Sequence, residues 1–160
     1  YLVVGEALER VRNEQYQLEQ KRTKGQSDVP VRTAQAQQNM AEWTKGLGEA
    51  AREMGSAAAK LYNAQAVIYL TLPKKYSPWS LYDLGAFGNN IILGASDRGL
   101  SSMTAYQFVK YPKMLRQQLP ISDAEDIIIG IGLGYRDATA LVNQITANRM
   151  PLDKIITINK

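Results

Sequence analysis

The residue types that this chain lacks narrow the chemistry it can do. Its 160 residues include no cysteine and no histidine. Within this chain, a Ser-His-Asp triad, a cysteine nucleophile, a histidine general base and a zinc site with Cys or His ligands are therefore excluded, and so are disulfide bonds. Any chemistry must come from carboxylates, lysines, tyrosines, backbone groups or a bound cofactor.

Three glycines, Gly130, Gly132 and Gly134, alternate along an apolar run that is typical of a strand. The spacing is not that of a dinucleotide-binding fingerprint, because the third glycine comes one residue early and a strand surrounds it. Since alternate residues of a strand share a face, these glycines leave one face without side chains. A flat group can then approach closely. We favour a packed helix there, with a cofactor ring as the alternative.

Three other features are candidate site elements. The stretch Gly99–Phe108 is short of charge and is predicted to be a loop, whose backbone N–H groups could donate to a ligand. An ordinary connection is the alternative. Arg149 could grip a phosphate with two hydrogen bonds, although a lone arginine is more often a surface residue. For Asp83 we expect a structural role as a helix N-cap rather than a role as a general base.

Composition excludes some classes of partner. The net charge is +4 and the pI is about 9.3, but the basic residues are scattered and no stacking aromatics interleave with them. We therefore expect no nucleic-acid binding; the charge reflects solvated side chains or attracts a phosphorylated cofactor. No apolar run is long enough to span a bilayer, so no membrane association is expected. Methionines without cysteine are compatible with the cytoplasmic location that we expect.

Hydrophobic patterning predicts the elements that must position these residues. The helix from Asp83 to Arg98 is apolar on most sides, so we expect it at the core of the domain or of a dimer, ending at Gly99. The order predicts a single α+β domain over 1–160, a three-layer α/β/α sandwich with a small mixed sheet. Strands are expected at 1–4, 64–72 and 126–135, helices at 6–21, 33–62 (one or two) and 112–118, and unpaired strand residues at 153–160.

Four stretches occur in the order of one known family. They are Tyr82–Phe87, Gly94–Leu100, Gly130–Asp137 and Asn143–Asp153. No single stretch is decisive, but the ordered set resembles the FMN-dependent nitroreductase family, closest to its nitrobenzoate-reductase-like branch. The resemblance is strong from Ala64 to Ile156.

The resemblance implies a homodimer that holds two FMN molecules at its interface. It also implies a ping-pong reaction in which hydride passes from NAD(P)H to a small-molecule electron acceptor such as a nitroaromatic or a quinone. By position, residues 150–160 match an arm that wraps the partner subunit. The implied cofactor-binding residues are Thr104, Ala105, Tyr106 and Gln107, whose backbone would face the flavin, and Arg149, which would hold its phosphate.

The chain also departs from the family. It starts just after the family's N-terminal Arg-Ser-x-Arg phosphate grip and Asn-x-Gln-Pro-Trp loop, and Tyr1 lies inside an expected strand, so we expect the natural N-terminus upstream. Thr104 replaces a proline that is common in this branch, and Ala147 stands where some relatives carry a second basic ligand. The chain therefore holds only part of a flavin site. The alternative function is a non-catalytic flavin-binding or structural dimeric homolog.

Overall fold

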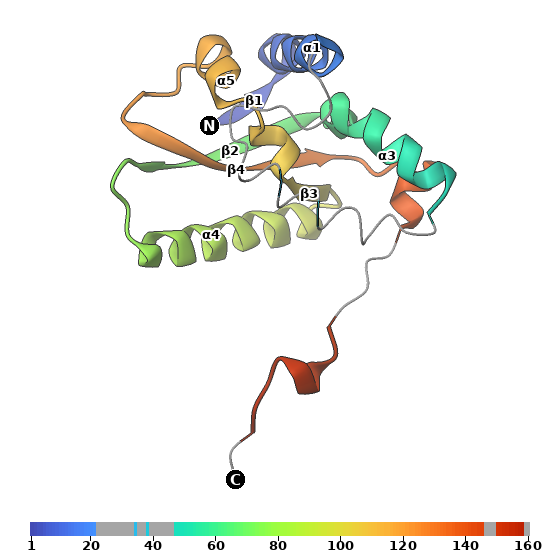
Figure 1. Cartoon of the computed structure of the whole chain (residues 1–160), viewed down its shortest axis with the longest axis vertical. Coiled ribbons are helices and arrows are strands. Elements are labelled where there is room, and N and C mark those ends of the chain that lie inside the picture. The colour runs from blue at the N-terminus through green and yellow to red at the C-terminus, as the bar shows by residue number, and fades with distance from the viewer. Residues whose placement is uncertain (22–33, 35–37, 39–46, 146–149, 159–160) are drawn as a thin grey trace.

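In the computed structural model of the chain, one four-stranded sheet runs in the order β1–β2–β4–β3 (Figure 1). The structure describes residues 1–21, 34, 38, 47–145 and 150–158. The strands are β1 (Leu2–Val4), β2 (Ala66–Pro73), β3 (Ser101–Ala105) and β4 (Glu125–Gly134).

All pairings between these described strands are antiparallel, so the expected mixed sheet is not found there. The reason lies in β3, which the sequence analysis missed. β2 and β3 both run antiparallel to β4 and lie on either side of it, so they are parallel to each other but not adjacent. This is a split β-α-β arrangement, in which the crossover helix joins two strands that a third strand separates.

Helices cover both faces of the sheet. The main helices are α1 (Gly5–Lys21), α3 (Glu49–Ala59), α4 (Pro78–Asp97) and α5 (Pro112–Gln118). Figure 1 shows α1 and α5 above the sheet and α4 below it. This confirms the α+β class and the three-layer α/β/α architecture.

Most predicted elements are confirmed to within a few residues: the strands at 1–4, 64–72 and 126–135, and the helices at 6–21 and 112–118. The described part of the expected helical region 33–62 contains α3, and residues 33, 35–37 and 39–46 lie outside the description.

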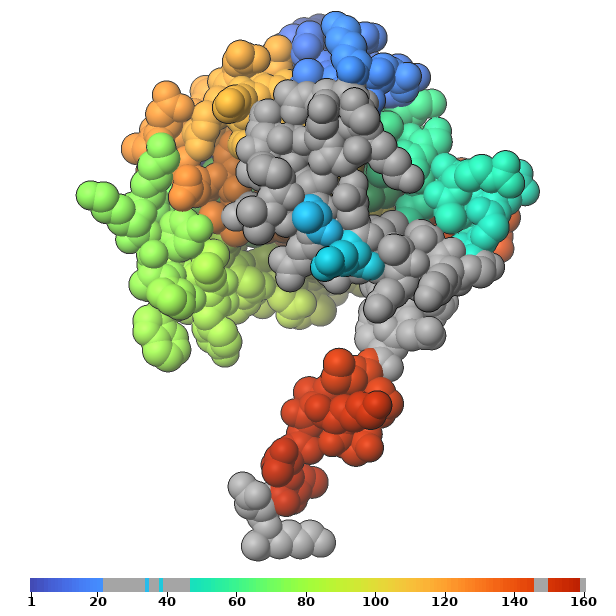
Figure 2. Space-filling model, in the orientation of Figure 1, coloured from blue at the N-terminus to red at the C-terminus, as the bar shows by residue number. Residues whose placement is uncertain are grey.

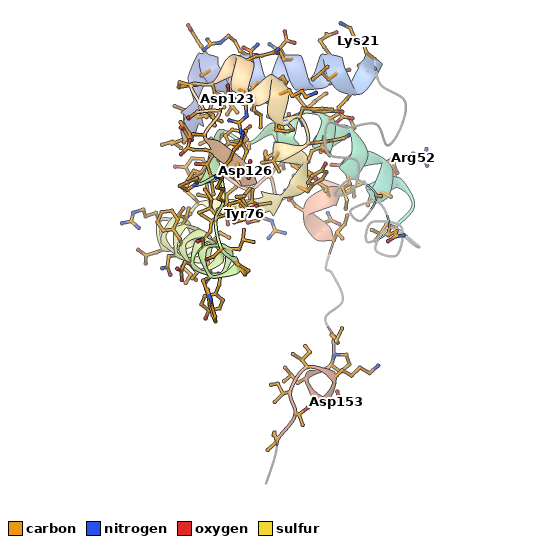
Figure 3. All side chains as sticks on the ribbon, turned by 60° about the vertical axis from the view of Figure 1, so that its left-hand side comes forward. Lys21, Arg52, Tyr76, Asp123, Asp126 and Asp153 are labelled. Carbon is orange, nitrogen blue, oxygen red and sulfur yellow. The ribbon has the colours of Figure 1, made fainter. Side chains whose placement is uncertain are left out.

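One expectation is wrong, and another is met only in part. The expected loop Gly99–Phe108 is β3 followed by the 3-10 turn η2 (Tyr106–Val109). At the C-terminal end, residues 150–158 carry the short turn η4 (Leu152–Lys154) and no strand. They are exposed and extend away from the body (Figures 2 and 3), and they pair with none of the described strands, as expected for unpaired residues.

The main hydrophobic core lies on one face of the sheet, between the strands, α1 and α5. Tyr69, Phe108 and Tyr111 are its largest fully buried side chains. No residue of α4 belongs to this cluster, and α4 buries only Gly88 and Ala95. Of the two locations expected for this apolar helix, the core of the domain is therefore wrong, and the core of a dimer stays a prediction. Trp79, Tyr82, Phe87 and Leu93 of the helix are exposed.

The start of α4 also differs from the prediction. Ser77 is the N-cap, and its Oγ accepts a hydrogen bond from the Ser80 N–H at 3.3 Å, with Pro78 in the first turn. Asp83 lies inside the helix and is exposed, so it is not the cap. Serine followed by proline is a strong start signal, because proline's fixed φ suits the first turn and its missing N–H is not needed there.

The end of α4 is as predicted. Gly99 has φ of 72°, and its N–H donates to the Ser96 carbonyl at 3.0 Å. The Leu100 N–H reaches back to the Ala95 carbonyl at 2.9 Å. These two bonds form a Schellman motif, which needs a left-handed residue that glycine adopts without a Cβ clash.

A left-handed turn of three non-glycine residues precedes β2. Leu61, Tyr62 and Asn63, which form the turn η1, have φ of 54°, 53° and 53°. This conformation costs roughly 1–2 kcal/mol for each such residue. The turn is held because Leu61 is fully buried and the Tyr62 ring packs on Phe108, with ring centroids 5.8 Å apart.

Tyr69 gives a prediction on the pH dependence of stability. Its hydroxyl is buried and has no hydrogen-bond partner among the described residues, and burial raises the pKa of Tyr69. The folded state therefore keeps the proton at a pH where the unfolded chain ionises. The contribution to stability is full below the ordinary tyrosine pKa and falls as the pH rises above it.

We expect Tyr69→Phe to be as stable as the wild type or up to about 1 kcal/mol more stable at pH 7, because an unsatisfied hydroxyl is removed. Between pH 9 and 11 it should lose less stability than the wild type. Urea unfolding at pH 7, 9 and 11 measures this, with the exposed Tyr135→Phe as control. An equal alkaline loss in wild type and Tyr69→Phe would contradict the argument.

Candidate functional site

The backbone direction along β2 can be worked out from its pairing with the chain's first residues. Tyr69 N donates to the Tyr1 carbonyl at 2.8 Å, and Tyr1 N donates to the Tyr69 carbonyl at 2.9 Å. Backbone groups of an antiparallel strand point alternately to its two neighbours. Tyr69 therefore faces β1, whereas Ile68 and Leu70 face β4.

The same alternation carries across β4 to β3. Ile131 lies opposite Ile68 and so directs its backbone groups to β2, which leaves Gly130 and Gly132 directed to β3. Their partners on β3 are Ala105 and Met103, which are therefore bonded within the sheet.

The two residues between and beside these partners have the opposite orientation. Thr104 and Ser102 direct their N–H and C=O groups out of the sheet, at an edge to which no described strand is paired.

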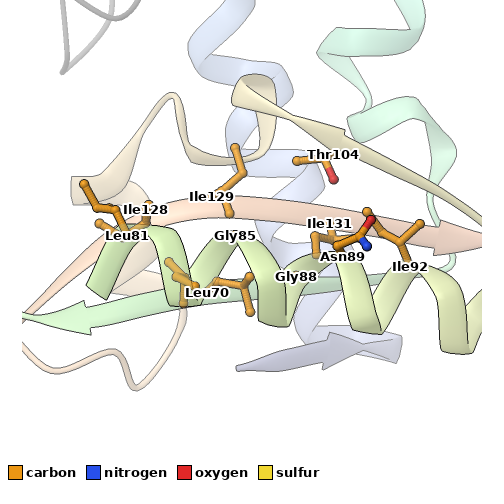
Figure 4. A pocket seen from close by; sticks show the side chains of 11 residues that line it. Leu70, Leu81, Gly85, Gly88, Asn89, Ile92, Thr104, Ile128, Ile129 and Ile131 are labelled. Carbon is orange, nitrogen blue, oxygen red and sulfur yellow. The ribbon is translucent and has the colours of Figure 1, made fainter. Parts of the chain in front are cut away.

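A cavity of about 320 Å³ lies between α4 and the sheet, and Thr104 is part of its wall. Figure 4 shows the side chains that line it, from α4 on one side and from β2, β4 and β3 on the other. Apolar groups dominate the lining, and its polar side chains are Asn89 and Thr104. The cavity therefore combines apolar walls with the outward-facing backbone of Thr104, as ligand sites commonly do. The main apolar lining residues are Leu70, Leu81, Ile92, Ile129 and Ile131.

The structure brings the four expected cofactor residues together at the end of β3. Thr104 is exposed, whereas Ala105 and Tyr106 pack against the hydrophobic core. The Gln107 side chain turns to α1, where its Nε2 donates to Glu19 Oε1 at 2.9 Å. Contact with a cofactor would therefore come mainly from the backbone of this segment and from Thr104. The fifth expected residue, Arg149, lies outside the described residues.

Two residues that contact this segment were missed by the sequence analysis. Gln15 is fully buried, and its Nε2 donates to the Gln107 carbonyl at 3.1 Å. Glu19 accepts from the Gln107 side chain, one helical turn further along α1. The sequence does contain a signal for a buried polar contact at Gln15, because Gln15 falls on the apolar stripe of α1, four residues after Val11. A polar residue in such a stripe needs a hydrogen-bond partner.

The side-chain-free face of β4 is occupied by the protein's own aromatic ring. A Cβ on Gly130 would clash with Phe108 Cβ, and one on Gly132 would lie 2.6 Å from Phe108 Cζ. The expected packed helix is wrong in detail, and a cofactor ring has no room on this part of the strand. The flat group that packs against Gly130 and Gly132 is the ring of Phe108, from the turn η2.

The stretch that follows β4 is organised by polar side chains. Asp137 Oδ1 accepts from the Thr139 backbone N at 2.9 Å and from its hydroxyl at 2.6 Å. These hydrogen bonds lower the pKa of Asp137. Asn143 Nδ2 donates to the Asp137 carbonyl at 2.8 Å, and Arg136 donates to the Asn143 carbonyl. This network fixes the turn η3 (Leu141–Gln144), just before the undescribed residues 146–149.

Other kinds of site were not found in the part of the chain that the structure describes. Its acidic residues form no group of three or more that could hold a metal ion. None of its helices combines the length and the apolar character needed to cross a membrane.

Comparison with known proteins decides the family. The sequence model of the nitroreductase family matches residues 1–135. The chain belongs to the nitroreductase family. Its fold is similar to that of the FMN-dependent nitroreductase NfnB from Mycobacterium smegmatis, solved in complex with NADPH, with a TM-score of 0.76 at 18% identity. That likeness covers 100% of this chain and 78% of the other.

Two curated relatives of this nitroreductase-family chain are 4-nitrobenzoate reductases. The one from Pseudomonas putida is 31% identical over 52% of this chain and 36% of its own length. The one from Nocardioides sp. (strain LMS-CY) is 35% identical over 49% of this chain and 32% of its own length. Each match thus spans about a third of the relative.

The outward direction of Thr104 predicts how the strand tolerates proline. We expect Thr104→Pro to cost at most about 1 kcal/mol, because the lost N–H is not used in the sheet. Met103→Pro should cost about 3 kcal/mol or more, because it removes a bond to Gly132. Chemical unfolding of the two variants measures the difference. Equal losses would show that the backbone alternation is assigned wrongly.

The space around two glycines predicts opposite effects for their replacement by alanine. Gly130→Ala should destabilise the chain by about 3 kcal/mol, since the new methyl group overlaps Phe108. Gly85→Ala, in the interior of α4 with nothing within 4 Å of the added Cβ, should stabilise it by about 0.5–1 kcal/mol. Thermal and urea unfolding test both. A neutral Gly130→Ala would contradict the close packing of Phe108.

Proposed function

We propose that this chain is the core of an FMN-dependent oxidoreductase that uses NAD(P)H to reduce nitroaromatics, quinones or similar electron-poor acceptors by a ping-pong reaction. The chain belongs to the nitroreductase family, and one observation on its structure supports the proposal. The end of β3 presents the outward backbone of Thr104 beside an apolar cavity, at the position where the family's flavin-facing segment is expected. When bound, FMN supplies the hydride chemistry, and the protein supplies binding, orientation and electrostatics.

The residues present suit the ring portion of FMN. A flavin ring system offers flat apolar faces and a polar edge that both donates and accepts hydrogen bonds. Thr104 presents an N–H donor and a carbonyl acceptor at the open edge of the sheet, and the adjoining cavity is lined mainly by aliphatic side chains. The turn η2 begins directly after Ala105, so its first N–H groups lie near the same edge.

Each part of the segment has a separate task in this proposal. The outward N–H of Thr104 and the first N–H groups of η2 would orient the ring and donate where negative charge develops on reduction, while Ala105 stays bonded to Gly130. The aliphatic lining of the cavity excludes water. Arg149 holds the phosphate of FMN through its guanidinium.

We further propose that the chain acts as a homodimer, with residues 1–160 as one domain and 150–160 as an arm to the partner. The outer face of α4 supports this. Trp79 is 78% exposed, Phe87 56% and Leu93 59%. This is an unusually large exposed apolar surface for one helix. The described part of the arm adds Leu152 and Ile158, 71% and 78% exposed. A second copy of the chain would bury these surfaces. The cytoplasm, where NAD(P)H is available, is the location that we propose.

The experiment compares FMN with riboflavin, which has the same ring system but no phosphate. We expect the full-length protein to bind FMN, to remain yellow after desalting, and to oxidise NAD(P)H only when a nitroaromatic or a quinone is present. Arg149→Ala should weaken FMN binding about tenfold or more and leave riboflavin binding unchanged. Arg52→Ala, an exposed arginine on α3, is the matched control and should change neither.

The alternative is a non-catalytic or purely structural dimeric homolog of the same fold. A full-length protein that forms a dimer by light scattering but takes up neither FMN nor riboflavin would favour it and would overturn the enzymatic proposal. A yellow protein that binds FMN but reduces no acceptor would favour the non-catalytic flavin-binding version.

A further inference from the structure

We propose that Gln15 and Glu19 of α1 are positioning residues that hold the Thr104–Gln107 segment in the orientation in which its backbone meets the flavin. This deepens the proposed function and rests on it. Neither residue lines the cavity, and both act through Gln107.

The contacts form a two-point clamp on one residue. Gln15 Nε2 donates to the backbone carbonyl of Gln107 at 3.1 Å, and Glu19 Oε1 accepts from the Gln107 side chain at 2.9 Å. Gln15 and Glu19 are four residues apart on a continuous helix, so they lie on the same face of α1. One rigid element therefore fixes both the main chain and the side chain of Gln107.

A lysine anchors the clamp. Lys110 Nζ donates to both carboxylate oxygens of Glu19, at 2.7 and 2.9 Å. The side chains of Lys110 and Glu19 are 13% and 20% exposed, so solvent screens this pair less than it would a surface pair. Because Lys110 follows directly after η2, the ion pair ties the far end of that turn to α1 as well.

The sheet holds the same turn from its other side. Phe108 sits on the face of β4 that Gly130 and Gly132 leave without side chains. With Phe108 packed on the sheet and Gln107 bonded to α1, the turn has little freedom to rotate. Thr104 and Ala105 join it directly along the chain. The direction of their backbone groups is set by the pairing of β3 with β4, and the clamp holds the turn that continues from them.

The arrangement explains a buried polar residue that packing alone does not. Gln15 is fully buried, and its Oε1 has no hydrogen-bond partner among the described residues. A leucine there would avoid this cost. The glutamine is accounted for if its Nε2 contact to Gln107 is needed by the site rather than by the core.

The test uses three variants of the full chain. Glu19→Ala removes the hydrogen bonds of the carboxylate to Gln107 and to Lys110. Glu19→Gln keeps an acceptor for Gln107 and loses the charge that pairs with Lys110. Gln15→Leu keeps the burial and removes the bond to the Gln107 carbonyl. Glu14→Ala is the matched control, because Glu14 is an exposed acid on the same helix and the change in charge is the same.

Two quantities are measured: amide hydrogen exchange of residues 104–107 in the free chain, and the dissociation constant of FMN from flavin fluorescence. We expect exchange about tenfold faster and FMN binding about tenfold weaker in Glu19→Ala, partial recovery in Glu19→Gln, and values within twofold of the wild type in Glu14→Ala. Gln15→Leu separates positioning from stability, since its midpoint of thermal unfolding should be unchanged or higher while exchange and binding still worsen.

Each outcome bears on one proposal or both. Wild-type exchange and FMN binding in both Glu19→Ala and Gln15→Leu would overturn the positioning role and leave the proposed function standing. A full-length wild-type protein that binds no FMN would overturn the proposed function and the flavin-positioning role together. In that case, the exchange data still decide whether α1 orders the segment.

Discussion

The aromatic ring of Phe108 lies where β4 has no side chains, and much of the fold is organised around that contact. Gly130 and Gly132 make room for the ring, and any larger residue at either position would overlap it. The ring also packs against Tyr62, in the left-handed turn that leads into β2. One side chain thus connects the central strand, the turn after β3 and the turn before β2. Segments that are far apart in sequence are brought into register by a single close-packed contact.

The two faces of the sheet do different work. The face under α1 and α5 holds the hydrophobic core, with Tyr69, Phe108 and Tyr111 fully buried. The opposite face carries the cavity and α4, on which Trp79, Tyr82, Phe87 and Leu93 are exposed. The closely packed face therefore supports the face that carries the cavity. The hydrogen bonds from α1 to Gln107 connect the packed face of the sheet to the end of β3, at the sheet's edge.

The sequence predicted those parts of the fold that depend on local signals. The apolar stripe of α1, the continuous apolar runs of β2 and β4, the proline at the start of α5 and Gly99 at the end of α4 each depend on a few neighbouring residues. β3 was missed because Ser-Ser-Met-Thr-Ala has little apolar character, and its strand conformation comes from pairing with β4. The N-cap of α4 differs from the prediction because Ser77 followed by Pro78 is a stronger signal for a helix start than Asp83.

The candidate site was predicted only in its position along the chain. That residues 104–107 form one segment follows from the order of motifs, but the outward direction of Thr104 depends on a register that runs through three strand pairings. Phe108 against the glycines is a contact between distant residues that no local pattern encodes. Gln15 was visible as a polar residue in an apolar stripe, yet its partner could not be named without the fold. Arg149 stays a prediction.

The way α4 meets the sheet has a consequence for the energetics of the whole molecule. Its buried residues are Gly88 and Ala95, which have almost no side chain with which to gain dispersion energy. The backbone of the helix comes close to Leu70 at Gly88, but few side-chain atoms interlock there. Local opening of α4 should therefore require less free energy than opening of the strands under α1, so that the native state has a firm side and a soft side. A second chain that covered α4 would raise the lower of these two free energies, and cooperative unfolding of the whole molecule would then depend on protein concentration.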